Sequence, residues 1–124
     1  MKNLWSGIIT EQVQASKAFY VQHFSCEVLF ESDWFVLLQL GGGELGFMLP
    51  NLDAQAGIFR TAFNGSGLWI TIDVENVEAQ FERLQQSNVD IVEPLKREAW
   101  GDYHFVVRDP NGIGVDVVER PAGA

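Results

Sequence analysis

A repeated dipeptide indicates an internal duplication in this chain. Leu-Trp occurs at residues 4–5 and again at residues 68–69, sixty-four positions later. The same offset aligns four further identical pairs, making six identities in twelve residues without a gap: Ile8 with Ile72, Glu11 with Glu75, Val13 with Val77 and Ala15 with Ala79. An internal repeat of this kind favours architectures that are built from copies of one structural unit. We therefore expect two copies of one structural unit, with Trp5 and Trp69 at equivalent positions across a pseudo-twofold axis.

Length, charge and cysteine content narrow the class of protein. A chain of 124 residues forms one domain, or two half-units that share one core. Its net charge of −9 argues against a nucleic-acid partner, which needs clustered Lys and Arg, but is compatible with a cationic one. The single cysteine, Cys26, excludes an internal disulfide and fits a reducing compartment. There is no signal-peptide core and no apolar run of about 20 residues, so we expect a cytoplasmic protein without a membrane partner.

Hydrophobic periodicity and turn residues predict a strand, a helix and three further strands in each half. In the first half we expect a strand at 3–10, a helix at about 12–23, and strands at 27–31, 34–40 and 44–49. In the second half we expect a strand at 68–74, a helix at 77–87 with Asn76 as its N-cap, and strands at 89–93, 103–108 and 113–119. Asp109-Pro110-Asn111-Gly112 is a strong turn between the last two strands.

Strand side chains alternate between the two faces of a sheet, and this alternation predicts a candidate ligand site. In the strand at 68–74 one face carries Leu68, Ile70, Ile72 and Val74, and the other carries Trp69, Thr71 and Asp73. The purely apolar face is the one that helices should cover. The opposite face collects our candidate ligand-binding residues: Trp5, Glu44, Met48, Trp69, His104, Arg108 and Asp116. Asp116 lies within an apolar strand and needs a partner, for which Arg108 is the nearest candidate.

With these patterns the chain resembles the vicinal oxygen chelate superfamily, which includes glyoxalase I, extradiol dioxygenases and the bleomycin and fosfomycin resistance proteins. The matching segments are Ser16-Lys17-Ala18-Phe19-Tyr20, Trp100-Gly101-Asp102-Tyr103-His104-Phe105, Asp109-Pro110-Asn111-Gly112 and Val115-Asp116-Val117-Val118-Glu119. The resemblance implies an α+β fold in which two βαβββ modules form a cupped, mostly antiparallel eight-stranded sheet, with helices on its outer face. It also implies one domain over residues 1–124, with modules at about 3–49 and 67–119 and a linker at 50–66, usually in a homodimer.

The resemblance also indicates where a metal would be held. Metal-dependent members carry ligands, usually His and Glu, in the first and last strands of each module. Here the first-strand positions match Trp5 and Trp69, and the last-strand positions match Glu44 and Asp116. Indole has no lone pair to offer a metal, and two carboxylates without imidazole suit Zn, Ni or Fe poorly. We therefore expect no metal and no cofactor.

Three functions fit the sequence. The leading hypothesis is a metal-free protein that binds, and by binding sequesters, an aromatic or cationic antibiotic; its two tryptophans would contact the ligand. The first alternative is a metal-dependent lyase, isomerase or dioxygenase with a rearranged site that uses Glu44, Asp116 and His104. The second is a structural or regulatory dimer in which the indoles fill the pocket. Indole in place of both expected histidines favours binding over catalysis.

Overall fold

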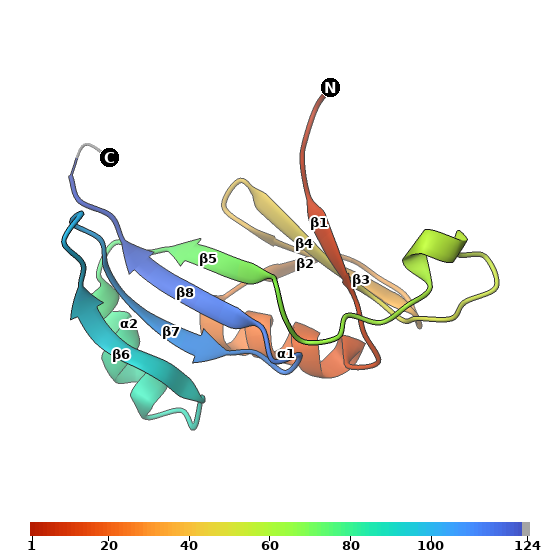
Figure 1. Cartoon of the computed structure of the whole chain (residues 1–124). Coiled ribbons are helices and arrows are strands. Elements are labelled where there is room, and N and C mark those ends of the chain that lie inside the picture. Colours follow the sequence, from red (N-terminus) through yellow and green to blue (C-terminus); the bar gives the residue numbers. More distant parts are fainter. Residues whose placement is uncertain (123–124) are drawn as a thin grey trace. The chain divides into compact units, whose positions relative to one another are not determined.

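The chain folds into two units of the same plan (Figure 1). The computed structural model describes residues 1–122. The units are Met1–Asn64 and Gly65–Ala124, and in each a strand and a helix precede three strands. The predicted α+β fold of two βαβββ modules is therefore confirmed, with the eight strands shared between two four-stranded sheets.

The first unit contains β1 (Ser6–Ile9), α1 (Val13–Phe24), β2 (Glu27–Glu31), β3 (Phe35–Leu40), β4 (Gly43–Met48) and the 3-10 turn η1 (Gly57–Phe59). Its strands are ordered β1-β4-β3-β2. β1 runs parallel to β4, and the other pairs are antiparallel. A two-residue turn joins β3 to β4, and Gly41 adopts φ +55° there, which glycine does without steric cost. β4 is therefore an inner strand, with β1 at the edge beside it.

The second unit repeats this order with β5 (Trp69–Asp73), α2 (Val77–Gln85), β6 (Ile91–Arg97), β7 (Tyr103–Arg108) and β8 (Gly114–Glu119). Its sheet has the order β5-β8-β7-β6, with β5 parallel to β8. The Asn76 side chain accepts a hydrogen bond from the Ala79 amide, which confirms the predicted N-cap. At the β7–β8 turn, Asp109 is buried and its Oδ1 accepts hydrogen bonds from the amides of Asn111 and Ile113.

Two predicted strand boundaries are wrong by more than two residues, for different reasons. The first strand begins at Ser6 rather than Asn3, and Leu4, which the prediction placed within the strand, is 94% exposed. Paired strand residues stop at the Ser6–Leu45 pair, so nothing holds the preceding residues extended. The sixth strand continues to Arg97, past the predicted end at Glu93 and through Pro94. β6 is an edge strand, where a missing amide proton costs no ladder hydrogen bond.

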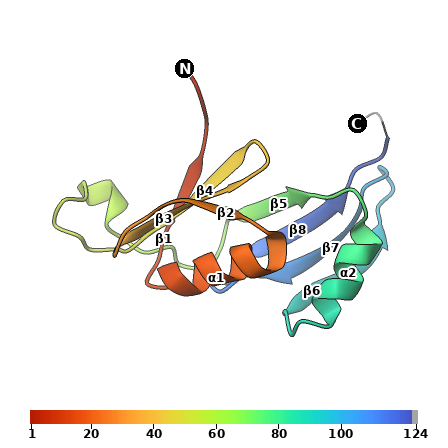
Figure 2. The same ribbon diagram turned by 180° about the vertical axis from the view of Figure 1, so that it is seen from behind.

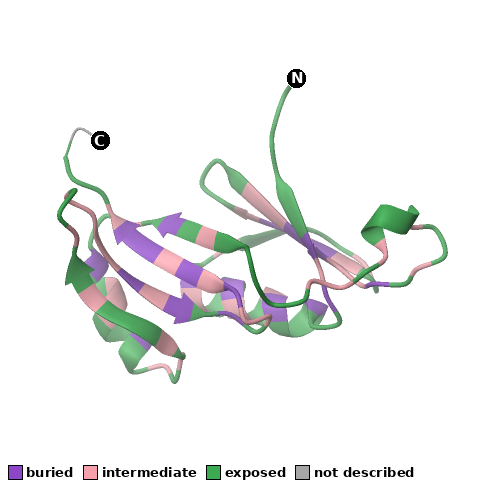
Figure 3. Ribbon diagram, viewed as in Figure 1, coloured by how far each residue is buried: buried purple, intermediate pink, exposed green. Residues whose placement is uncertain are grey.

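Each sheet is covered on one face by its own helix, as Figure 2 shows from behind. In the first unit Tyr20 of α1 stacks on Phe47 of β4, with ring centroids 5.6 Å apart. Burial alternates along β7 and β8, which is visible in Figure 3. We call the face that the helix does not cover the open face of each sheet. Within the described residues, neither helix is long and apolar enough to cross a membrane.

Cys26 follows the left-handed Ser25 that ends α1, and its amide donates to the Tyr20 carbonyl. Burial raises the pKa of the Cys26 thiol above its usual value, because desolvation penalises the thiolate. We expect iodoacetamide to label the folded chain more slowly at pH 8 than the urea-unfolded chain, with intact mass giving the rate. As this is the only cysteine, every adduct reports on it. Equal rates in the two states would contradict the shift.

Candidate ligand-binding surfaces

On the open face of the first sheet, a glycine lets two aromatic rings approach the backbone. Gly46 of β4 pairs with Gly7 of β1 and Leu37 of β3. A Cβ at Gly46 would lie 3.0 Å from Cζ3 of Trp5 and 3.3 Å from the ring of Phe35. Any side chain at this position would push one or both rings away. Trp5 therefore lies over Gly46, with its side chain on the predicted face.

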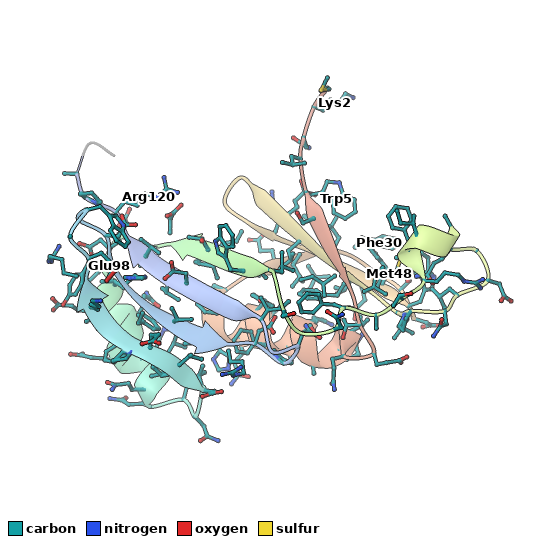
Figure 4. The ribbon with its side chains drawn as sticks, viewed as in Figure 1. Lys2, Trp5, Phe30, Met48, Glu98 and Arg120 are labelled. Atoms are coloured by element: carbon teal, nitrogen blue, oxygen red, sulfur yellow. The ribbon has the colours of Figure 1, made fainter. Side chains whose placement is uncertain are left out.

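Four rings form an aromatic cluster on this unit: Trp5, Phe30, Trp34 and Phe35. Phe35 is at its centre, with ring centroids 6.3 Å from Trp5, 6.1 Å from Phe30 and 5.8 Å from Trp34. The three outer members remain accessible, at 47%, 55% and 44% exposure. Figure 4 labels Trp5 and Phe30 among the side chains. Adjoining aromatic rings that remain uncovered present a surface suited to an apolar or planar ligand.

Sequence reasoning found Trp5 and offered Trp34 as a further aromatic candidate for a pocket rim, but it missed Phe30 and Phe35. A register shift between Val28 and Phe30 interrupts the pairing of β2 with β3. Such a bulge breaks the simple two-residue alternation, so the face of Phe30 could not be read from its position. Trp34 lies just outside β3, where no alternation applies. Two other candidates share the open face: Glu44, which pairs with Gln39, and Met48, which pairs with Phe35.

The open face of the second sheet carries a polar strip rather than an aromatic cluster. Trp69 is 72% exposed, and its indole Nε1 donates to Oγ1 of Thr71 at 3.0 Å. Thr71 of β5 pairs with Asp116 of β8. Asp116 Oδ1 lies 2.6 Å from Nδ1 of His104 on β7. Three strands thus place Trp69, Thr71, Asp116 and His104 in sequence across one face.

The predicted partner of Asp116 is wrong. Arg108 donates from Nε to Oδ2 of Asp90 at 3.0 Å, and its position pairs with Gly114. Asp116 pairs with Val106, so residues two positions along β7 are its diagonal neighbours, within reach of a long side chain. His104 is one of these and makes the contact. The pair is partly accessible, with side chains 21% exposed for His104 and 31% for Asp116.

The β-sheet register also shows that Glu44 and Asp116 do not occupy equivalent positions. Trp69 pairs with Gly114, and Thr71 pairs with Asp116. In the first unit the pair Gly7–Gly46 corresponds to Thr71–Asp116, so Asp116 is equivalent to Gly46. Glu44 is equivalent to Gly114. Each of these two equivalent pairs, Gly46 with Asp116 and Glu44 with Gly114, therefore contains only one carboxylate. The duplication had suggested that Glu44 and Asp116 were equivalent to one another.

The residues at the superfamily's metal positions do not fit a metal. Trp5 and Trp69 offer no lone pair, and the Trp69 N–H is donated to Thr71. Asp116 is engaged by His104. In the described part of the chain, no group of three or more His, Cys, Asp or Glu could hold a metal ion.

A cavity of about 260 Å³ is lined by Ser25, Glu27, Gln39, Leu40 and Gly41, and none of the predicted ligand residues lines it.

Solved structures share this fold over nearly the whole chain. TioX from Micromonospora sp. ML1 matches with a TM-score of 0.78 and 18% identity, over 96% of this chain and 99% of that one. A lactoylglutathione lyase from Agrobacterium tumefaciens matches with a TM-score of 0.78 and 22% identity, over 96% of this chain and 94% of that one. At such identities the likeness concerns the fold alone.

Sequence comparison adds relatives and a family. An uncharacterized protein of Mycobacterium bovis is 30% identical over 64 residues, which are 52% of this chain and 42% of that protein. One of Mycobacterium tuberculosis is 30% identical over 64 residues, 52% of this chain and 38% of its own. The match thus spans less than half the length of these curated relatives. The sequence model of one family matches residues 4–117, and the chain belongs to that family, the Glyoxalase/Bleomycin resistance protein/Dioxygenase superfamily.

Proposed function

We propose that this chain is a metal-independent protein that binds a planar aromatic cation on the aromatic cluster of its first unit. The observation that carries the proposal is the exposure of Trp5 and Trp34 around Phe35, with Gly46 keeping the sheet clear beneath Trp5. Such an arrangement offers ring faces and edges to a flat ligand. Aromatic contacts of this kind contribute roughly 0.5–1.5 kcal/mol each beyond the burial of area.

The preference for a cation rests on charge. The chain carries a net charge of −9, so a cationic ligand is attracted over a long range. Close to the cluster, Glu44 shares the open face with Gly46, two residues along β4. A cation over an indole face gains a further attraction from the ring quadrupole. An anionic ligand would gain neither the long-range attraction to the net negative charge nor the attraction to the indole face.

Donor chemistry supports binding over metal catalysis. Tryptophan in place of imidazole leaves no lone pair at the first-strand positions, and a carboxylate alone is a weak site for transition metals. Within the superfamily to which the chain belongs, we therefore infer the role of sequestering an aromatic antibiotic, for which affinity is sufficient. That the chain forms a homodimer and lies in the cytoplasm remains a prediction.

Replacing Trp5 tests this proposal. We expect Trp5→Ala to weaken binding of 10-methylacridinium, a planar cation without an N–H or hydroxyl group, by about tenfold, because one ring contact and its buried area are lost. The measurement is the fluorescence anisotropy of the dye titrated with chelator-treated protein. Trp100→Ala is a matched control: it removes an exposed indole in the second unit, whose N–H donates to Asp102, and should leave the affinity unchanged.

Two results would contradict the proposal. Equal affinity for 10-methylacridinium in the unaltered chain and in Trp5→Ala would show that the aromatic cluster is not the binding site. The second is one equivalent of Ni, Zn, Fe or Mn in protein purified without chelator or histidine tag. That finding would direct attention to glyoxalase and dioxygenase assays.

A further inference from the structure

The polar strip of the second unit plays no part in the proposed function. In its central pair, Asp116 and His104, the chemistry of the two groups decides which one donates the hydrogen bond. An ionised carboxylate can only accept, so in the Asp116–His104 contact of 2.6 Å the Nδ1 of His104 is the donor. When the imidazole is neutral, its lone pair is therefore on Nε2. Asp116 thus fixes the tautomer of His104 and turns Nε2 into a hydrogen-bond acceptor.

In the described part of the chain, no group donates a hydrogen bond to that acceptor. The nearest charged atom is Oε1 of Glu98, 3.9 Å from Nε2, which is beyond hydrogen-bond distance. The lone pair on Nε2 and the carboxylate oxygen of Glu98 are both acceptors, so no hydrogen bond can form between them. Glu98, labelled in Figure 4, is instead held by Lys96, whose Nζ lies 3.0 Å from the same oxygen. Nε2 is therefore available to a donor on a ligand.

Two strands away from this acceptor, on the same face, lies a flat apolar surface. Trp69 is 72% exposed, and its N–H is already donated to Thr71, so the ring offers a ligand its π-surface rather than a hydrogen bond. The donated bond also directs the indole along β5 toward the Thr71–Asp116 pair. β5 and β7 are separated by two strand spacings, about 10 Å, which suits a fused-ring aromatic better than a single ring.

Charge further limits the ligand class. Asp73 is neutralised by a two-point contact with Arg120, and Glu98 by Lys96. Within the described residues, the Asp116 carboxylate pairs with His104 and with no lysine or arginine, so a neutral His104 leaves an excess of negative charge around the acceptor. An anionic ligand is disfavoured there, and a neutral or cationic donor is favoured.

We propose that the second unit carries a binding site for fused-ring aromatics that bear a hydroxyl or N–H group, with Trp69 contacting the ring and His104 Nε2 accepting the hydrogen bond. Asp116 acts as a positioning residue, through the tautomer of His104. The site shares with the proposed function the premise that the chain binds small aromatics, but it uses none of the aromatic cluster residues.

The test uses two probes of one shape, 2-naphthol and 2-methoxynaphthalene, of which only the first can donate. We expect the full chain to bind 2-naphthol about fivefold more tightly than the ether, as for one net hydrogen bond. In His104→Phe the ratio of the two dissociation constants should fall to about one, with the affinity for the ether retained. In Asp116→Asn the amide donates to Nδ1, which moves the imidazole proton to Nε2, so the ratio should fall to one or below.

Further variants separate this site from its alternatives. Trp69→Ala should weaken both probes equally and leave the ratio unchanged, and Trp100→Ala should change neither. Trp5→Ala should also leave the ratio unchanged, so a failure of the proposed function and a failure of this site give different results. A ratio that depends on Trp5, that survives in His104→Phe, or that is one in the unaltered chain would overturn the assignment. So would the absence of binding by both probes.

A measurement without any substitution guards against a variant that does not fold. The chain has two histidines, so the long-range nitrogen NMR spectrum contains two imidazole patterns. In the free chain we expect His104 to show a protonated Nδ1. On addition of 2-naphthol, its Nε2 resonance should shift, while that of His23 stays in place. A protonated Nε2 in the free chain, or no shift on titration, would refute the acceptor role.

Discussion

Phe47→Ala is expected to lower the free energy of unfolding by about 3–5 kcal/mol, the usual cost of removing a buried phenylalanine ring. Phe47 is completely buried on the helix-covered face of the first sheet. Its ring stacks on Tyr20 of α1, and its backbone neighbours across the sheet, Ile8 and Val36, are also buried. The deletion leaves a cavity that these strands cannot close without moving. Urea unfolding followed by tryptophan fluorescence gives the loss.

Phe30→Ala is the matched control for this change. It deletes the same atoms from a ring that is 55% exposed, so we expect a loss of about 1 kcal/mol or less. Since stabilities of small domains are only about 5–15 kcal/mol, the milder Phe47→Leu keeps the measurement possible if the alanine variant does not fold. Similar losses for Phe47→Ala and Phe30→Ala would show that the core of the first unit is not where we place it.

Asp109→Ala is expected to cost about 2–4 kcal/mol, because hydrogen bonds to a buried charged acceptor contribute about 1.5–3 kcal/mol each and are not fully additive. Oδ1 of Asp109 accepts from the amides of Asn111 and Ile113 at 2.8 and 2.9 Å. Asp109 is 4% exposed, so water cannot easily replace the lost acceptor. The substitution also loosens the turn that sets the start of β8. Thermal or urea unfolding of the variant measures the effect.

Two further substitutions isolate the role of that oxygen. Asp109→Asn keeps Oδ1 as an acceptor and should cost about 1 kcal/mol, the value of a neutral hydrogen bond exchanged for a stronger one. Asp53→Ala removes a fully exposed carboxylate, 3.6 Å from Arg60, and should change stability very little. If the alanine and asparagine variants at position 109 lost the same stability, the capping oxygen would not be the cause.

The order of the elements could be predicted because it depends on local signals. The apolar spacing of Val77, Phe81 and Leu84 marked α2, and Asn76 capped it as expected. The Asp-Pro-Asn-Gly turn marked the gap between β7 and β8, where Gly112 adopts φ +79°. Where prediction erred, as at Leu4 and beyond Pro94, the reason was the presence or absence of a neighbouring strand. A single strand carries no information about where its neighbours end.

The candidate site, too, could be predicted only in part from the sequence. Alternation placed Trp5, Glu44 and Met48 on one face of the first sheet, and the register agrees with this. It could not find Phe30, because a bulge changes the alternation in β2. It chose Arg108 rather than His104 as the partner of Asp116. Both residues lie diagonally from Asp116 across the ladder, but Arg108 pairs with Asp90 and His104 contacts Asp116.

By itself the sequence determined the duplication, the α+β plan of each unit, and the replacement of the expected imidazoles by indoles. These follow from residue identity and from the two-residue and 3.6-residue periods, which every stretch of chain carries locally. Tertiary structure decided that Asp116 is equivalent to Gly46 and is held by His104, and that three rings gather around Phe35. Cross-strand offset is the physical reason, because packing and turn geometry of the whole sheet set it, and no single strand encodes it.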